Sequence, residues 1–289
     1  MIKPLFTGVC TALVTPFLEE KINYPMVQVL LKRQQDAHIP AVILAGTTGE
    51  APTLSDDEKL SLFRVAKKHV GTSMTIIAGT GSNDTAHAAE LSRAAQEEGA
   101  DALLVVSPYY NKATPAGLYA HYLSIAHAVS IPIILYNVPS RTGVDIPVSV
   151  YQRLARIPNI VGVKEASNDI TKIAQIRNAC GDEFSVWSGN DNMTVPAVAM
   201  GAKGVISVAS NIVPAQMRDM VGAALDGDLD TASDLQCRLS PLLELLQCEV
   251  NPIPVKAAMS RIGLDCGSCR LPLTELTAKN LQRIQQFFG

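Results

Sequence analysis

Short runs of Val, Ile, Leu and Ala recur along the chain, and each is followed by a stretch of helical length with an apolar face. Eight of these runs lie at residues 8–14, 41–45, 74–78, 102–106, 133–136, 160–164, 184–188 and 204–208. They show no polar alternation, so both faces of each predicted strand should be buried, as in a parallel sheet covered by helices. A βα unit of roughly 30 residues made eight times predicts a closed (β/α)8 barrel, the TIM barrel of the α/β class.

Helices are predicted between the strands, at residues 56–70, 85–98, 115–129, 147–156, 169–180 and 194–200. Two of them have start signals, because Ser55 precedes Glu58 by three residues and Asp84 precedes an Ala-rich run. After residue 213 the strand signals stop, and helices are predicted at residues 214–225, 229–248, 254–262 and 273–288. We therefore expect a catalytic barrel over residues 1–225 and a C-terminal helical extension over residues 226–289 that packs on it.

An open doubly wound sheet is the competing fold, and the turn after the first strand argues against it. Such a sheet usually has a Gly-rich phosphate-binding turn at this place. This chain has Val14-Thr15-Pro16-Phe17 there, without a glycine. The closed barrel is therefore favoured.

Composition and charge narrow the range of partners. The 289 residues are 47% hydrophobic and 18% charged, with a net charge of −3. There is no basic excess, so neither nucleic acid nor an anionic membrane is expected as a partner. No run approaches the roughly 18 apolar residues of a membrane span, and the N-terminus lacks a secretory signal pattern. The expected location is the cytoplasm.

Metal and redox chemistry find little support in the sequence. Cys266 and Cys269 have the spacing of half a zinc site or of a redox pair, but no second Cys pair or His cluster completes it. The five histidines are far apart along the chain, and none follows a predicted strand. We expect no metal and no cofactor, and reduced thiols at the six cysteines.

The polar residues that follow the predicted strands are the candidates for chemistry, because barrels of this type build their active sites at the carboxyl ends of the strands. Lys164 ends the sixth strand. Desolvation or a nearby cation lowers the pKa of a lysine from about 10.4 towards roughly 7–8, where the free amine can attack a carbonyl and form a Schiff base. The alternative is a lysine at the barrel rim that pairs with a carboxylate such as Glu165.

Five more polar residues follow other strands. Tyr136 and Tyr110 can carry protons, since a phenol both donates and accepts, although each can also be an ordinary packed aromatic. Thr47 and Thr48 lie between glycines, which lets their hydroxyls and amides approach a ligand, but Gly-Thr-Thr-Gly is also a plain turn. Arg141 offers a planar fork for a carboxylate, or a surface salt bridge.

Five motifs in register resemble the dihydrodipicolinate synthase and N-acetylneuraminate lyase superfamily over essentially the whole chain, and most closely its dihydrodipicolinate synthase branch. The motifs are residues 46–50 (GTTGE), 108–111 (PYYN), 135–143 (LYNVPSRTG), 163–166 (VKEA) and 251–256 (NPIPVK). The resemblance implies a Schiff-base lyase of the diaminopimelate route to lysine. In it Lys164 condenses with pyruvate and Tyr136 donates and accepts the proton at the imine.

The resemblance implies two further sets of contacts for the substrates. Thr48 and the backbone around Ile206 would hold the pyruvate carboxylate and its neighbours. Arg141 would receive the carboxylate of the second substrate, L-aspartate 4-semialdehyde. The enamine of pyruvate would add to that aldehyde and the product would cyclise, without a cofactor or a metal.

The resemblance also implies an oligomer. Thr47 would link Tyr136 to Tyr110 in a proton relay, and in the family this second tyrosine reaches across from a neighbouring subunit. Members are commonly homotetramers, built as dimers of tight dimers. We therefore expect a homo-oligomer, with the tetramer as the expected form.

One departure from the family pattern concerns feedback by lysine. Many bacterial and plant members have a lysine-inhibition site at the tight-dimer interface, with an acidic residue on the third helix. The matching residue here is His87, and Asp56 and Lys59 stand where sensitive bacterial members have histidines, although Asn83 and Tyr109 do match. We predict weak or absent inhibition by lysine.

Two rival functions remain at this point. Another pyruvate aldolase on the same barrel, such as a sialic acid lyase or a 2-keto-3-deoxy sugar-acid aldolase, would share Lys164 and Tyr136. Arg141 favours a short acidic aldehyde over a sugar. A barrel that only binds a keto acid, as a sensor or structural subunit, would have no use for the complete set of Lys, Tyr and Thr.

Overall fold

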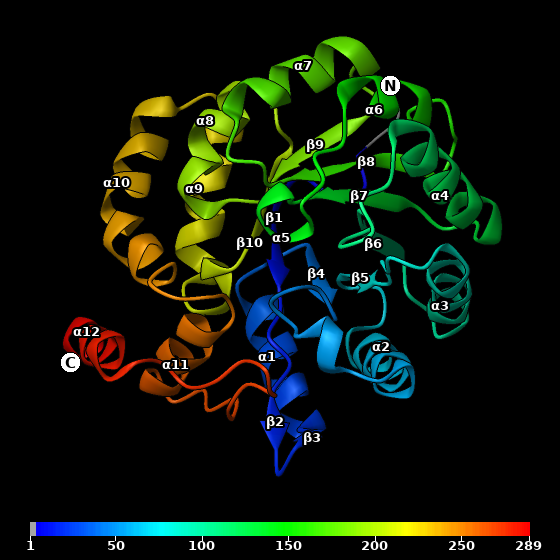
Figure 1. Cartoon of the computed structure of the whole chain (residues 1–289). Helices are drawn as coiled ribbons and strands as arrows, with labels where there is room; N and C mark the ends of the chain where they lie inside the picture. The colour runs from blue at the N-terminus through cyan, green and yellow to red at the C-terminus, as the bar shows by residue number, and fades with distance from the viewer. Residues whose placement is uncertain (1–3) are drawn as a thin grey trace.

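The computed structural model describes residues 4–289, and its centre is the closed parallel barrel that the sequence predicts (Figure 1). The strands follow chain order around the barrel, and the last one pairs with the first to close it. The eight strands are β1 (Gly8–Ala12), β4 (Ala41–Leu44), β5 (Thr75–Gly79), β6 (Ala102–Val106), β7 (Ile133–Asn137), β8 (Ile160–Glu165), β9 (Ser185–Ser188) and β10 (Gly204–Ser207).

Helices surround the barrel on its outside (Figure 1). Those of the βα units are α1 (Tyr24–Asp36), α2 (Asp56–Val70), α3 (Thr85–Glu97), α4 (Pro115–Ala128), α6 (Val148–Leu154), α7 (Ile170–Cys180), α8 (Thr194–Ala199) and α9 (Pro214–Leu225). Short helical turns follow four strands as η1 (Ala51–Thr53), α5 (Pro139–Thr142), η2 (Asp191–Met193) and η3 (Ala209–Asn211). The C-terminal helices are α10 (Leu229–Leu245), α11 (Ile253–Arg261) and α12 (Ala278–Phe288).

The C-terminal helices share one hydrophobic core with the barrel layer. Leu242 of α10, Val255 of α11 and Ile284 of α12 are buried in the same cluster as the outward-facing strand residues. The C-terminal helices that the sequence predicts are thus present. A boundary between residues 225 and 226 stays a prediction.

Local side-chain signals set the starts of several helices. Ser55 and Glu58 form the predicted capping box of α2, and Asp84 accepts hydrogen bonds from the first backbone N–H groups of α3. The sequence predicts a last helix from residue 273, but α12 begins at Ala278. Thr277 precedes it and donates both its N–H and its hydroxyl to Glu249, which fixes the helix start there.

One helix and one hairpin lie outside the predicted elements. The strands β2 (Phe17–Leu18) and β3 (Lys21–Ile22) form a small antiparallel pair after β1. Helix α1 follows them, and Asn23 caps it by accepting from the N–H of Met26.

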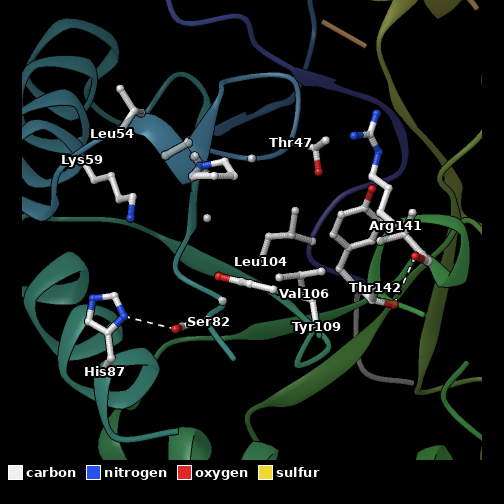
Figure 2. Close-up of a pocket in the computed structure, with 18 of the residues that line it drawn as sticks. Thr47, Leu54, Lys59, Ser82, His87, Leu104, Val106, Tyr109, Arg141 and Thr142 are labelled. Carbon is white, nitrogen blue, oxygen red and sulfur yellow. Dashed lines mark hydrogen bonds between the residues drawn. The ribbon is translucent and has the colours of Figure 1, made fainter. Parts of the chain in front are cut away.

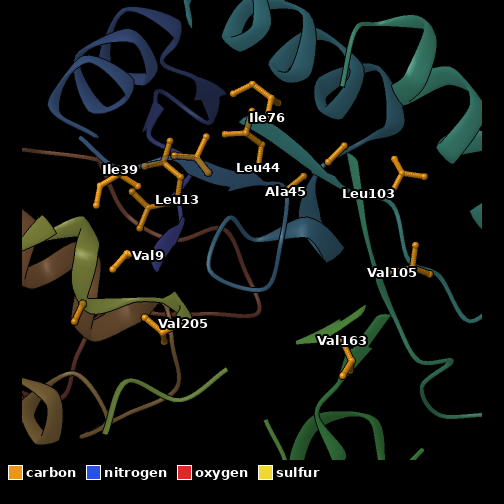
Figure 3. Close-up of a cluster of buried hydrophobic side chains, with 14 of the residues drawn as sticks. Val9, Leu13, Ile39, Leu44, Ala45, Ile76, Leu103, Val105, Val163 and Val205 are labelled. Atoms are coloured by element: carbon orange, nitrogen blue, oxygen red, sulfur yellow. The ribbon is translucent and has the colours of Figure 1, made fainter. Parts of the chain in front are cut away.

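Alternation along the strands divides the buried side chains into two layers. The outward layer lies between strands and helices and includes Val9, Leu44, Ile76, Leu103, Val163 and Val205 (Figure 3). The inner layer fills the barrel and includes Cys10, Ile43, Ile77, Leu104, Ile134, Tyr136, Trp187 and Ile206. On β8, Val163 belongs to the outward layer, so Lys164 is directed into the barrel and Glu165 away from it.

Candidate active site

Lys164 and Tyr136 meet at the carboxyl end of the barrel. They are register partners on β8 and β7, and the Nζ of Lys164 lies 4.4 Å from the centroid of the Tyr136 ring. Both side chains are buried, with 5% and 6% of their surface exposed. Lys164 does not pair with Glu165 and takes part in none of the ion pairs of residues 4–289. An amine without a carboxylate in contact therefore faces the interior, beside a phenol.

Gly189 gives the lysine side chain the space it needs. This residue follows β9, and its N–H donates to the backbone oxygen of Glu165 at 2.7 Å. A Cβ at this position would lie 2.6 Å from the Cβ of Ala166 and 3.2 Å from the Cε of Lys164. A glycine is therefore required where the chain leaves β9 beside Lys164.

A cavity of about 210 Å³ opens beside Lys164 and brings several of the predicted site residues together. Tyr136, Thr47, Thr48, Arg141 and Lys164 all line it. They come from the ends of β4, β7 and β8, so residues far apart in sequence share one small space. The predicted grouping at the barrel mouth is thus present in the structure.

Asn251, from the segment before α11, connects two of these residues. Its Nδ2 donates to Thr48 Oγ1 at 3.0 Å, and its backbone oxygen accepts from Arg141 Nη2 at 3.2 Å. Its own Oδ1 is buried and has no hydrogen-bond partner among the described residues. The sequence motif at 251–256 indicated this segment, but no role for Asn251 follows from sequence, because its contacts lie across the fold.

Tyr110 lies apart from the other predicted residues. Its side chain is 89% exposed, its backbone has a φ of +73°, and it lines neither cavity of the barrel mouth. Thr47 lines both cavities, yet no hydrogen bond joins it to Tyr110 among the described residues. Within one chain the predicted Tyr136–Thr47–Tyr110 relay is therefore incomplete.

Ile206 lies inside the barrel and not on the cavity wall. It is fully buried on β10 and is the register partner of Cys10 on β1. Burial strongly raises the pKa of the Cys10 thiol, so this neighbour of Lys164 stays neutral. Ile206 is therefore part of the inner layer and does not line the cavity beside Lys164.

A second, larger cavity of about 650 Å³ extends from Thr47, Tyr136 and Arg141 to a polar cluster at its far end (Figure 2). There His87 Nε2 lies 2.7 Å from Asp56 Oδ2, and Lys59 Nζ lies 3.3 Å from Asp56 Oδ1. Burial acts to raise the pKa of Asp56, but the hydrogen bonds from His87 and Lys59 outweigh it and lower the pKa. The carboxylate is thus occupied by its two neighbours.

Glu165 anchors the outer side of β8. Its carboxylate accepts from Asn137 Nδ2 at 3.0 Å and from the N–H of Ser167 at 2.8 Å, with Lys172 Nζ at 4.0 Å. Burial raises the pKa of Glu165, and Lys172 with these hydrogen bonds opposes the shift. This network fixes the end of β8 from behind, next to Lys164.

Glu50 connects the Thr47–Thr48 turn to the C-terminal helices. Lys256 of α11 donates to Glu50 Oε1 at 2.8 Å, and both side chains are almost fully buried. The backbone N–H of Arg270 donates to Glu50 Oε2 at 2.8 Å. The turn after β4 is therefore held by residues more than two hundred positions later in the chain.

Within residues 4–289 no three His, Cys, Asp or Glu side chains gather as they would around a metal ion. Cys266 and Cys269 are free thiols, and burial raises their pKa values to about 12 and about 11. In the same residues, no helix is long and apolar enough to cross a membrane.

Comparisons with known proteins agree with the geometry. The model of the dihydrodipicolinate synthetase family matches residues 5–288. The curated 4-hydroxy-tetrahydrodipicolinate synthase of Acetivibrio thermocellus is 46% identical over 99% of this chain and 97% of its own length.

Two solved structures are similar over nearly their full length. One is dihydrodipicolinate synthase from Aquifex aeolicus, at 42% identity and a TM-score of 0.96, covering 98% of this chain and 97% of that one. The other is the enzyme from Cyanidioschyzon merolae with lysine bound, at 41% identity and a TM-score of 0.95, with the same coverage.

Proposed function

The chain belongs to the dihydrodipicolinate synthetase family, and from this premise we propose that it is a lyase that condenses pyruvate with L-aspartate 4-semialdehyde in lysine biosynthesis. The observation that carries the proposal is the buried Lys164 amine, free of a contacting carboxylate and 4.4 Å from the Tyr136 ring. It lies in a chain whose full-length curated relatives are named 4-hydroxy-tetrahydrodipicolinate synthase.

Lys164 is the nucleophile in this proposal. Its amine adds to the keto carbon of pyruvate, and loss of water gives the imine. Loss of a proton from the methyl carbon gives an enamine, which forms a carbon–carbon bond to the aldehyde. The amino group of the second substrate then attacks the imine carbon, closes the ring and frees Lys164. Tyr136 is assigned the proton transfers at the carbinolamine, because its side chain is the phenol beside the amine.

Substrate binding is assigned to the polar groups around the cavity. Thr48 and the backbone near Ile206 would hold the pyruvate carboxylate. Arg141, on α5 at the opening, would hold the carboxylate of the aldehyde. Its guanidinium already donates to the backbone of Asn251, which supports a fixed orientation of the fork.

We assign Thr47 and Tyr110 to a proton relay that a second subunit completes. An aromatic side chain that is 89% exposed, on a backbone with φ of +73°, supports a contact outside its own chain. On this basis the protein would be a homo-oligomer, with a tetramer of two tight dimers as the specific proposal. Six free thiols and the metabolic substrates support a location in the cytoplasm.

A coupled assay tests the activity. Pyruvate and L-aspartate 4-semialdehyde are supplied with the next reductase of the diaminopimelate route, and loss of NADPH is followed. We expect turnover that disappears in Lys164→Ala and persists in the control Lys279→Ala, an exposed lysine on α12. No turnover, with borohydride still trapping pyruvate on Lys164, would instead indicate a sugar-acid aldolase. Retained keto-acid binding in Lys164→Ala without turnover in the native protein would indicate a sensor.

A further inference from the structure

Asp191 places a carboxylate in the cavity of Lys164. It begins η2, two residues after Gly189, and lines the same cavity of about 210 Å³. Its Oδ2 accepts hydrogen bonds of 2.9 Å from the backbone N–H groups of Val208 and Ala209. Its Oδ1 is buried and has no partner among the described residues. A buried carboxylate with one free oxygen calls for a compensating positive charge.

Of the described groups around Lys164, only Asp191 can supply a negative charge to balance its ammonium. Tyr136 faces it from β7 and the neutral Cys10 thiol from β1, while Arg141 on α5 is itself a cation. Among the described residues that line the cavity, Asp191 alone is acidic. Glu165 is directed away from the barrel and is satisfied by Asn137, Ser167 and Lys172.

We propose that Asp191 is a positioning residue that balances the charge of Lys164, first as the ammonium of the resting protein and then as the iminium of the pyruvate adduct. The second half of this statement rests on the proposed function, and the first half does not. A carboxylate near an amine favours its charged form. The same field favours the iminium over the neutral carbinolamine that precedes it.

The two hydrogen bonds of Oδ2 give Asp191 a second effect. Val208 and Ala209 directly follow β10, where the backbone near Ile206 would hold the pyruvate carboxylate. Asp191 therefore joins the turn beside the pyruvate position to the charge of the nucleophile. Burial raises the pKa of Asp191, and the nearby Ser207 hydroxyl, the two amides and, as the smallest contribution, the Lys164 charge oppose that shift. The ionised state of the carboxylate thus depends in part on Lys164.

A double-mutant cycle on thermal unfolding tests the charge pair without any substrate. The variants are Lys164→Met, Asp191→Asn and the two combined. Each single change should lower the Tm, because it leaves the other charge buried and uncompensated. The combined variant should lose less than the sum of the two. Additive losses would overturn the proposal. An Asp191→Asn protein that folds only when Lys164→Met is also present supports it, and one that folds in neither background overturns it.

The pH profile of kcat/KM for pyruvate separates a charge effect from a merely structural one. Asp191→Asn keeps an oxygen acceptor for the two amides but removes the charge. Without the carboxylate the ammonium form is less favoured, so the acid limb of the profile should move to lower pH by about one unit. The control Asp228→Asn removes the same charge at the exposed start of α10 and should leave the limb in place.

A loss of rate at every pH, with the acid limb unmoved, would overturn the proposal. Borohydride trapping of pyruvate on native Lys164 tests the proposed function separately. Its failure would remove the iminium part of the inference and leave the unfolding cycle as the test of the charge pair.

Discussion

Asn251 donates a hydrogen bond of 3.0 Å to the Thr48 hydroxyl and so connects the segment before α11 to the end of the second barrel strand. Its backbone oxygen also holds Arg141. One residue of the C-terminal helical region thus contacts side chains assigned to both substrates. If these assignments hold, the region is part of the active site and not only a cover for the barrel.

Asn251→Ala should lower kcat/KM for pyruvate while leaving the fold intact, because alanine removes the donor to Thr48 but keeps the backbone oxygen that accepts from Arg141. Loss of the bond to Thr48 costs about 1 kcal/mol, and the buried Thr48 hydroxyl left without this partner adds to the cost, so a decrease of roughly five- to thirtyfold is expected. The coupled assay gives the values, and thermal unfolding checks the fold. Asn280→Ala is the matched control, since Asn280 lies on α12 and bonds Glu249 outside the cavity. Equal activity of the two variants would contradict the assignment.

Arg141→Ala should affect the two substrates unequally. A charge-assisted bond to a carboxylate contributes about 1.5–3 kcal/mol, so KM for L-aspartate 4-semialdehyde should rise by roughly 10- to 100-fold. KM for pyruvate should change little, because Lys164 and Thr48 hold that substrate. Steady-state kinetics with each substrate varied in turn would measure both. A larger rise in KM for pyruvate would contradict this assignment and show that Arg141 binds the pyruvate carboxylate instead.

The barrel and the place of Lys164 in it could be predicted from sequence because both depend on local pattern. Eight apolar runs give eight strands, and a lysine at the end of one run must lie at the carboxyl end of the barrel. The direction of Lys164 follows from the period of two, since its neighbour Val163 packs outward. Five motifs in register also allow the family to be predicted from the sequence.

The contacts around that lysine could not be predicted, because they join residues from different elements. Asn251 meets Thr48 from 203 positions away, and Asp191 meets Val208 from 17. Helix α1 was not among the predicted elements, and nothing in a single chain shows what Tyr110 contacts. Pattern places a residue on an element, whereas its partners depend on how the loops fold over the barrel mouth.

The buried pair of Glu50 and Lys256 predicts a large loss of stability on truncation. Lys256→Ala leaves the Glu50 carboxylate unpaired in the interior, which costs about 3–5 kcal/mol. Chemical denaturation of the two proteins would measure it. Lys32→Ala is the control, because its pair with Asp36 is exposed and such pairs contribute about 0–1 kcal/mol. Similar small losses in both variants would show that Glu50 finds another partner or is neutral.

His121 predicts a pH-dependent part of the stability. Burial lowers its pKa from 6.5 to about 4, and only its Nδ1 has a partner, Thr85. Between these two values the unfolded chain binds a proton that the folded protein does not. The free energy of unfolding should therefore fall by up to about 3 kcal/mol as the pH decreases from 6.5 to 4.

His121→Asn should flatten this part of the pH dependence, even though the variant is less stable at neutral pH. Denaturant unfolding at a series of pH values would give the slope. His127→Asn, an exposed position on the same helix, serves as the control and should keep the native slope. An unchanged slope in His121→Asn would assign the acid sensitivity to carboxylates whose pKa is lowered in the folded protein, such as Asp56.

L-lysine should inhibit this protein weakly or not at all. The ammonium of a bound lysine needs a carboxylate, and the acidic group at the far end of the larger cavity is Asp56. His87 at 2.7 Å and Lys59 at 3.3 Å already occupy it, and Lys59 would also repel the ligand. Titration of the coupled assay with L-lysine measures the effect, and norleucine, which lacks the terminal amine, is the ligand control.

His87→Glu should increase the sensitivity to lysine but not to norleucine. An inhibition constant in the sub-millimolar range for the native protein, specific for lysine, would mean that the cavity supplies a carboxylate from elsewhere, such as a second subunit.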